Sequence, residues 1–475
     1  MNKALAHAKK VLEGVLLTGF AIQIGLGLAY LCVSFSSFQE FGDSYLLIEA
    51  SKNLCFDEYT GILYPLFLLC MRGFTYVIPV PLFIPVKIFQ LLAAFFSGIF
   101  LMQTIYKRHW IKNVYGSLCI MTMPFIMQCH TALLPQSLAL TLLLLELSFF
   151  IRFVRQDREG MGNLAAVGGC MLLLTLLMPE YLLFASVFVI AGTGYLFAKK
   201  INQKFRPVLC VILLVCLVLS FVSVIYERQD HGTMREKRSL AAMTLSRFTG
   251  SRFEETYGYW PEDLRTCISE ETVIWCGEHA LDRQQLLVQQ AVSALGSERA
   301  EQAFFEAAKF GFQVYGKEVR HEILIDMATY TFSPFLLQYQ LQGRGPISFS
   351  GRNYDILRTC CPRLSAYYIN YAGWWFAMGI LLSVLCGLMD FVIILNGKRK
   401  GQIMEKRNVR EVVTCLWTGF LTGMLMVVCY TFQGSGIMDY KNTIFLLVVY
   451  WMFQSSCMDF FYPSLTDQSK DCEPE

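Results

Sequence analysis

The sequence carries little charge for its length, because 16% of its 475 residues are Asp, Glu, Lys or Arg while 55% are hydrophobic. Soluble chains have about 25% charged and about 45–50% apolar residues. The composition therefore excludes a soluble globular protein. The net charge is only +3, so there is no overall basic field of the kind that attracts nucleic acid. No nucleic-acid partner is expected.

Internal repeats and linkers rich in Pro or Ser are also lacking, which argues against a solenoid and against a string of tethered domains. The 17 cysteines do not form a disulfide framework, because most lie within apolar segments, where cysteine behaves as a small buried hydrophobe. Cys267 and Cys276 lie in a polar part of the chain, and a bridge between them stays open.

Uninterrupted apolar segments are abundant, and most approach the roughly 20 residues that cross a membrane. The first is too long for a cleaved signal core and is interpreted as a retained helix. Gly162–Phe197 is long enough for two spans that turn at Pro179. The pattern predicts an all-α, polytopic transmembrane helix bundle of about ten spans, and its clearest segments are Val11–Ser34, Ile84–Tyr106, Ser137–Phe153, Pro207–Tyr226, Tyr368–Asn396 and Glu411–Phe432.

Lys and Arg lie in clusters between these segments, and their distribution gives an orientation. All the main clusters fall on one side if Leu63–Pro79, which contains Pro65 and Arg72, stays at the membrane interface instead of crossing. That side is the cytoplasm, so the protein is expected in the cytoplasmic (plasma) membrane, among membrane lipids, with a cytoplasmic N-terminus. The clusters are Lys3 to Lys10, Lys107 to Lys112, Arg152 to Arg158, Lys199 to Arg206 and Lys398 to Arg410.

Hydropathy also divides the chain. Residues 1–226 form an N-terminal transmembrane module whose first outer loop, 35–83, holds juxtamembrane helices. Residues 227–367 form a mostly helical extracytoplasmic cap, 368–457 the C-terminal transmembrane helices and 458–475 a cytoplasmic tail. Within the cap, Arg228–Arg265 is expected to be mixed or loop, whereas helical spacing predicts helices over Leu281–Leu295, Glu298–Tyr315 and Glu318–Gln342.

The most informative motif follows the first span and reads Gly42-Asp43-Ser44-Tyr45, with Tyr64-Pro65-Leu66-Phe67 further on. An aspartate just outside the membrane can deprotonate a hydroxyl or hold a divalent cation. The spacing after Asp43 suggests a short amphipathic helix along the interface, anchored by the Tyr45 ring.

This order of motifs resembles the C superfamily of integral membrane glycosyltransferases, which includes the dolichol-dependent and protein O-mannosyltransferases. Leu133-Leu-Pro135-Gln136-Ser137-Leu138 and Met178-Pro179-Glu180-Tyr181 are similar to two later family motifs, and Asp439-Tyr440-Lys441-Asn442 is similar to a third. The sequence departs from the family at Ser44, where a second acid is common, at Gln136, where Glu is common, and at Met178, where Arg is common.

The resemblance implies a transferase that moves a sugar from a polyprenyl-phosphate donor to a hydroxyl of a glycan, lipid or protein. Asp43 would then be the catalytic residue. No metal-ligand set is identified and the cofactor is unknown, although a divalent cation near Asp43 stays open. The charge distribution places outside the cytoplasm Asp43, Glu180, Gln136, His130 and Asp439. The candidates for substrate or phosphate binding are Tyr45, Tyr64, Arg72, His130, Gln136, Glu180, Asp439 and Lys441.

Three other interpretations remain. Arg72 lies near membrane depth and could meet a lipid phosphate or pair with Asp43 or Asp57. A polysaccharide polymerase or ligase would use Arg and His residues of the cap instead of Asp43. The departures at Gln136 and Met178 would also suit a non-catalytic protein that binds a lipid-linked sugar.

Overall fold

The protein is helical wherever its structure is described, and no strand occurs in those residues. In this computed structural model they comprise residues 2–35, 44–53, 62–106, 109–131, 133–155, 160–178, isolated positions between 211 and 222, 253–278, 283–332, 362–399 and 440–461. The chain divides into two compact units. The first combines Met1–Tyr226, Asp355–Phe420 and Leu447–Glu475, and the second combines Glu227–Tyr354 and Leu421–Leu446.

The first unit contains the helices that can cross a membrane. Among the described residues, four helices are long and apolar enough: Ala4–Ser34 in α1 (Asn2–Ser34), Phe83–Tyr106, which is α4, Pro135–Phe153 in α7 (Pro135–Arg155) and Asn370–Met389 in α20 (Pro362–Arg399). Each agrees with a predicted apolar segment. The expected spans within 179–210 and 411–432, and most of 207–226, lie outside the described residues.

Shorter helices complete this unit. α8 (Gly160–Leu177) packs against α7, and the last part of α22 (Tyr440–Ser456) leads into the 3-10 turn Asp459–Phe461. The apolar stretch after α4 forms two helices, α5 (Trp110–Met121) and α6 (Pro124–Thr131), because Pro124 has no N–H and interrupts the helical hydrogen bonds.

Backbone carbonyls at the break between α5 and α6 accept hydrogen bonds from side chains of other helices. Gln23 Nε2 donates to the Cys119 carbonyl at 3.2 Å, and the Tyr368 hydroxyl of α20 donates to the Thr122 carbonyl. A Cβ atom at Gly27 would lie 2.8 Å from Thr122 Cβ, so glycine there allows α1 to approach the break. The interruption is therefore a packed feature of the bundle.

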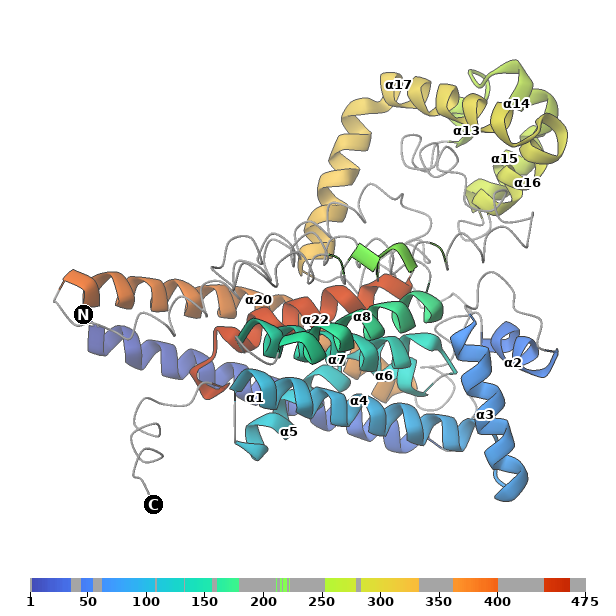
Figure 1. The fold of residues 1–475 in the computed structure, drawn as a ribbon. Helices are drawn as coiled ribbons and strands as arrows, with labels where there is room; N and C mark the ends of the chain where they lie inside the picture. Colours follow the sequence, from blue (N-terminus) through green and yellow to red (C-terminus); the bar gives the residue numbers. More distant parts are fainter. Residues whose placement is uncertain are drawn as a thin grey trace. The chain divides into compact units, whose positions relative to one another are not determined.

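Basic residues gather at one end of the bundle, which we call the basic end. α1 begins there with Lys9 and Lys10, α5 begins there with Lys112, and α7 ends there, where Arg152 donates to Thr104 near the end of α4. Figure 1 shows the last turn of α20, which ends at Arg399, beside the start of α1. The structure thus brings together Lys and Arg residues from distant parts of the sequence.

Two further helices mark the opposite end, which we call the α2–α3 end. They are α2 (Ser44–Asn53) and α3 (Leu63–Val77), and the first turn of α4 lies there too. Figure 1 shows α3 running across this end of the bundle, whereas α1, α4 and α7 run along it. The orientation of α3 is therefore unlike that of the four helices that can cross a membrane.

The second unit has its own apolar core of helices around Trp260. Its elements are α13 (Phe253–Tyr257), α14 (Glu262–Cys267), α15 (Glu270–Glu278), α16 (Arg283–Leu295) and α17 (Ser297–Phe332). The indole N–H of Trp260 donates to Thr256 at 3.2 Å, and Arg299 forms an ion pair with Asp263 at 2.8 Å.

The structure bears on three points that the sequence raised for this region. Residues 253–265, expected to be mixed or loop, include α13 and most of α14, because Trp260 and Leu264 supply core contacts that short helices can use. The two helices predicted over Glu298–Tyr315 and Glu318–Gln342 are confirmed within the described residues. α17 consists of two helical segments that meet at a kink at Tyr315, where φ is −106° and ψ is 20°, and residues 333–342 lie outside the described residues. Cys267 is a free thiol that donates to the Asp263 carbonyl, so it is not bridged to Cys276.

Candidate functional site

A cluster of buried polar side chains lies at the α2–α3 end, and it includes Tyr64 of α3. The Tyr64 hydroxyl accepts a hydrogen bond of 2.8 Å from Gln90 Nε2. Gln90, on α4, also donates from Nε2 to the Leu134 carbonyl at 3.2 Å. Both side chains are fully buried. These contacts link α3 to α4 and link α4 to Leu134, the residue just before α7.

His130 and Ser137 form the second part of the cluster. His130 lies in the last turn of α6, and Ser137 lies in the first turn of α7, which Pro135 begins. Proline is favoured at this position because its fixed φ suits the first helical residue and its missing N–H would have no partner there. His130 Nδ1 is hydrogen-bonded to Ser137 Oγ at 2.7 Å.

Gln136 follows Pro135 and is fully buried. Its Oε1 and Nε2, together with Gln90 Oε1 and His130 Nε2, have no hydrogen-bond partner in the part of the chain that the structure describes. Leaving a buried donor or acceptor unpaired costs about 1–3 kcal/mol. Four such atoms on three neighbouring elements indicate a place where a polar ligand, water or another polar group belongs. We call Tyr64, Gln90, His130 and Gln136 the neutral cluster, because it contains a phenol, two carboxamides and an imidazole and has no carboxylate, ammonium or guanidinium group.

Two basic residues at the same end bind the ends of helices. Lys87 of α4 is fully buried, and its Nζ donates to the carbonyls of Ser34 at 3.1 Å and Phe35 at 3.3 Å. Arg72 of α3 donates from Nη2 to Ser51 Oγ at 2.9 Å and from Nη1 to the Ser51 carbonyl at 3.4 Å. Arg72 therefore contacts α2.

The structure brings only some of the predicted site residues together. Tyr64 is hydrogen-bonded to Gln90, and Gln90 bonds the Leu134 carbonyl, two residues before the buried Gln136. His130 bonds Ser137, the residue after Gln136, and Arg72 contacts α2 at the same end of the bundle. Asp43, Glu180 and Asp439 lie outside the described residues. Tyr45 and Lys441 lie in the first turns of α2 and α22, but their side chains are likewise outside the description.

Gln90 was not predicted as a site residue, although the sequence contains a signal for it. Gln90 follows Lys87 by three residues within the apolar segment Ile84–Tyr106. Residues three apart lie on the same face of a helix, and two polar side chains on one face of a membrane-spanning helix indicate a function or an internal partner.

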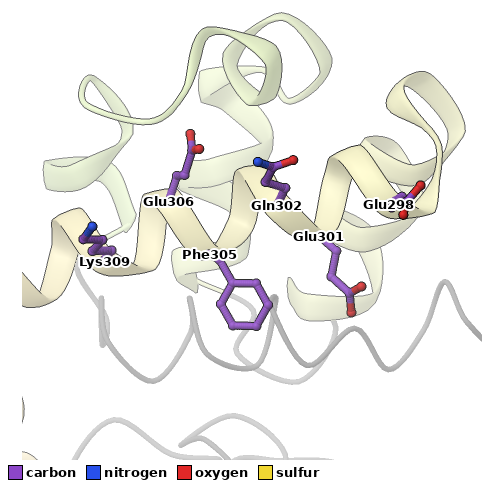
Figure 2. A pocket seen from close by; sticks show the side chains of 6 residues that line it. All are labelled: Glu298, Glu301, Gln302, Phe305, Glu306 and Lys309. Carbon is purple, nitrogen blue, oxygen red and sulfur yellow. The ribbon is translucent and has the colours of Figure 1, made fainter.

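A second surface, on the second unit, is less informative. A hollow of about 400 Å³ lies on α17, and all its lining side chains belong to that helix. Figure 2 shows Phe305 and Glu301 on one side of the helix and Gln302 and Glu306 on another. The polar side chains therefore do not converge. The lining residues are Glu298, Glu301, Gln302, Phe305, Glu306 and Lys309.

Among the described residues, no group of three or more His, Cys, Asp or Glu side chains is placed to hold a metal ion. The arrangement that is present can donate and accept neutral hydrogen bonds. The chain matches no protein-family model, no curated protein and no solved structure.

Proposed function

We propose that this chain is a membrane glycosyltransferase. It would move a sugar from a polyprenyl-phosphate donor to a hydroxyl of a glycan, lipid or protein acceptor on the extracytoplasmic face. One observation carries the proposal. The Tyr64–Gln90 pair, the His130–Ser137 pair and Gln136 are buried where α3, α4, α6 and α7 pack together, and four of their polar atoms have no partner among the described residues. Gln90 also bonds the Leu134 carbonyl, which links the Tyr64 motif to the motif that contains Gln136.

The orientation rests on the basic end. Cytoplasmic loops of membrane proteins carry an excess of Lys and Arg, so the basic end is assigned to the cytoplasm and the α2–α3 end to the opposite face. The direction of α3 across the bundle supports an interfacial position for Leu63–Val77. With α3 outside the membrane, the apolar segments amount to about ten spans.

The chemistry of the neutral cluster suits a sugar. Each sugar hydroxyl donates and accepts a hydrogen bond, and the cluster offers both kinds of atom in Gln90, His130 and Gln136. A site built to bind hydroxyls in this way discriminates strongly against ligands that lack them, because its own buried atoms would then stay unpaired.

Asp43 supplies the base in this proposal. The acceptor oxygen would form a bond to the anomeric carbon of the sugar as the bond from that carbon to the phosphate oxygen breaks. The acceptor proton would pass to the Asp43 carboxylate, and the lipid phosphate would leave with the bonding electron pair. A single displacement of this kind inverts the anomeric centre.

The first test compares the surface glycans of cells with and without the chain by mass spectrometry, because this comparison requires no choice of donor. The second replaces Asp43 by Asn. Asp43→Asn removes the charge and keeps the size and shape of the side chain. We expect a loss of transfer of about 10²–10⁴-fold, the usual contribution of a general base.

Unchanged glycans in cells that lack the chain would contradict the proposal. Full transfer by Asp43→Asn would exclude Asp43 as the base and would favour a polymerase or ligase that acts through another residue. Binding of the lipid-linked sugar by the wild-type chain without transfer would instead support a non-catalytic role.

A further inference from the structure

A pair of stacked aromatic rings lies on the surface of the second unit. The ring centres of Tyr259 and Phe310 are 4.7 Å apart, and the angle between the ring planes is 21°. Tyr259 follows α13, and Phe310 belongs to α17. Phe310 is half-buried, whereas Tyr259 is 66% exposed. Phe310 therefore covers one face of the Tyr259 ring, and the other face is open to solvent.

The backbone that carries Tyr259 is held by hydrogen bonds and by the core of the second unit. The Tyr259 N–H donates to the Thr256 carbonyl, and the Trp260 N–H donates to the Tyr257 carbonyl, both at 3.0 Å. The Tyr257 hydroxyl donates to the Ile268 carbonyl at 2.7 Å, and the Trp260 side chain is buried in the core. A ligand that stacks on Tyr259 therefore has to order little of the chain, which favours binding.

α17 fixes the second ring and places polar side chains in line with it. Phe310 follows the core residues Ala307 and Ala308. Side chains four residues apart lie on the same face of a helix, so Gln302, Glu306 and Phe310 form a row about 12 Å long. Figure 2 shows Gln302 and Glu306 on the same side of the helix. Helical side chains lean toward the N-terminus of their helix, so the Phe310 ring lies toward Glu306.

The two polar side chains of this row are accessible to a ligand. Gln302 and Glu306 are exposed, and neither forms a hydrogen bond or an ion pair with another residue that the structure describes. A carboxamide donates and accepts hydrogen bonds, and a carboxylate accepts them. The row thus places both kinds of hydrogen-bonding group beside an aromatic face.

A neutral sugar ring suits this combination. One side of a sugar ring carries C–H groups that can pack against an aromatic face, and its hydroxyls donate and accept hydrogen bonds at the edge. The surrounding surface is acidic, because α17 begins with Glu298 and Glu301 and α13 carries Glu254 and Glu255. Like charges repel across an interface, so a ligand that carries phosphate or carboxylate groups is disfavoured.

We propose that Tyr259, Phe310, Glu306 and Gln302 form a binding surface for a neutral oligosaccharide. One sugar ring stacks on the open face of Tyr259, and its hydroxyls bond the polar side chains of the row. We call these four residues the stacking surface, which shares no residue with the neutral cluster. Only the identification of this oligosaccharide as the acceptor of transfer rests on the proposed function. The competing ligand is a cationic group, which an aromatic face and a carboxylate also attract.

The experiment measures binding of the full chain in lipid nanodiscs to an array of neutral oligosaccharides that also carries a lysine-rich peptide. Nanodiscs avoid maltoside detergents, whose sugar headgroups would compete. We expect binding of neutral oligosaccharides that Tyr259→Ala weakens about 2–12-fold, the range for one stacking contact. Tyr259→Phe retains the ring and should bind like the wild type. Phe305→Ala is the matched control and should also bind like the wild type, because Phe305 is an exposed aromatic residue on another side of α17 (Figure 2).

Glu306→Gln distinguishes the two ligand classes. This substitution removes the charge and keeps a hydrogen-bonding side chain of the same size. Binding of a neutral oligosaccharide should stay within about threefold of the wild type and should not depend on salt. Binding of the lysine-rich peptide would fall by up to about fivefold and would weaken as salt is added.

Three outcomes would overturn the inference: no binding of any neutral oligosaccharide, binding of the lysine-rich peptide alone, or equal losses in Tyr259→Ala and Phe305→Ala. The inference and the proposed function can also fail separately. Sugar binding by a chain whose absence leaves the surface glycans unchanged would keep the stacking surface and remove the transferase. Transfer that depends on Asp43, together with no binding on the array, would do the opposite.

Discussion

At the scale of single residues, Gln136 is the most informative side chain. It lies where the resembled family commonly has Glu, and both polar atoms of its buried carboxamide lack a partner within the described part of the chain. A buried carboxylate at this position would cost more than a carboxamide unless it were paired. The substitution is therefore compatible with a site that contacts neutral hydroxyls.

Replacing Gln136 by Leu separates stability from function. Leu has a similar volume and removes two unpaired polar atoms. We therefore expect the free energy of unfolding to stay the same or rise by up to about 1–3 kcal/mol, and the midpoint of thermal unfolding to stay the same or rise with it. Transfer should fall at least about tenfold, because sugar hydroxyls lose their partners. The measurements are thermal unfolding in one detergent and transfer of labelled sugar.

Gln454 provides the matched control. Its carboxamide atoms are also buried without a described partner, but it lies on α22 next to Ser455, which accepts a hydrogen bond from Tyr106 at the end of α4. Gln454→Leu should therefore have the same effect on stability as Gln136→Leu and no effect on transfer. Equal loss of sugar transfer in both variants would mean that the loss does not come from contacts between Gln136 and the substrate.

At the scale of helices, close packing depends on small residues at contacts between spans. A Cβ atom at Gly98 of α4 would lie 2.3 Å from Ser117 Oγ and 3.3 Å from Ser117 Cα of α5. The Ser117 hydroxyl donates to the Phe95 carbonyl at 2.9 Å. Small residues that let backbones approach are typical of helix interfaces in membranes.

Gly98→Ala is expected to destabilise the first unit by about 1–3 kcal/mol, the usual cost of overpacking. Gly169→Ala is the control, because a Cβ atom at Gly169 of α8 meets nothing within 4 Å among the described residues. It should be neutral or stabilising by up to about 1 kcal/mol, since alanine favours helix more than glycine. A stable Gly98→Ala variant would contradict the close contact between α4 and α5.

Helix positions were largely predictable from hydropathy, whereas their contacts were not. The apolar segments at Ile84–Tyr106 and Ser137–Phe153 correspond to α4 and α7 within a few residues. The kink at Tyr315 lies at the predicted boundary between two helices, whereas the contact of Arg72 with Ser51 joins residues 21 positions apart and was not predicted. The sequence indicated Tyr64, His130 and Gln136 individually, and the spacing of Gln90 from Lys87 indicated a polar helix face but not the partners of Gln90, which are Tyr64 and the Leu134 carbonyl.

At the scale of the whole molecule, the orientation of the first unit in the membrane can be tested with introduced cysteines. Tyr76 of α3 is 85% exposed and Trp110 at the start of α5 is 72% exposed. We expect an impermeant maleimide added to intact cells to label Tyr76→Cys but not Trp110→Cys. Trp110→Cys should react only after the membrane is permeabilised.

The unmodified chain serves as the background, because its own cysteines include the exposed Cys32 and Cys70. The reverse labelling pattern would invert the assignment of the α2–α3 end and place the neutral cluster on the cytoplasmic side. Labelling of both positions in intact cells would show that α3 and the start of α5 are not on opposite sides of the membrane.

The break between α5 and α6 also has a consequence for biosynthesis. The Thr122 carbonyl takes its hydrogen bond from Tyr368, a residue 246 positions later in the chain. The ribosome synthesises α20 long after α5 and α6, so the Thr122 carbonyl lacks the Tyr368 hydrogen bond until α20 has been made. A nascent chain arrested before residue 362 would hold the break without Tyr368, and we expect such an intermediate to depend on water or on the insertion machinery until α20 arrives.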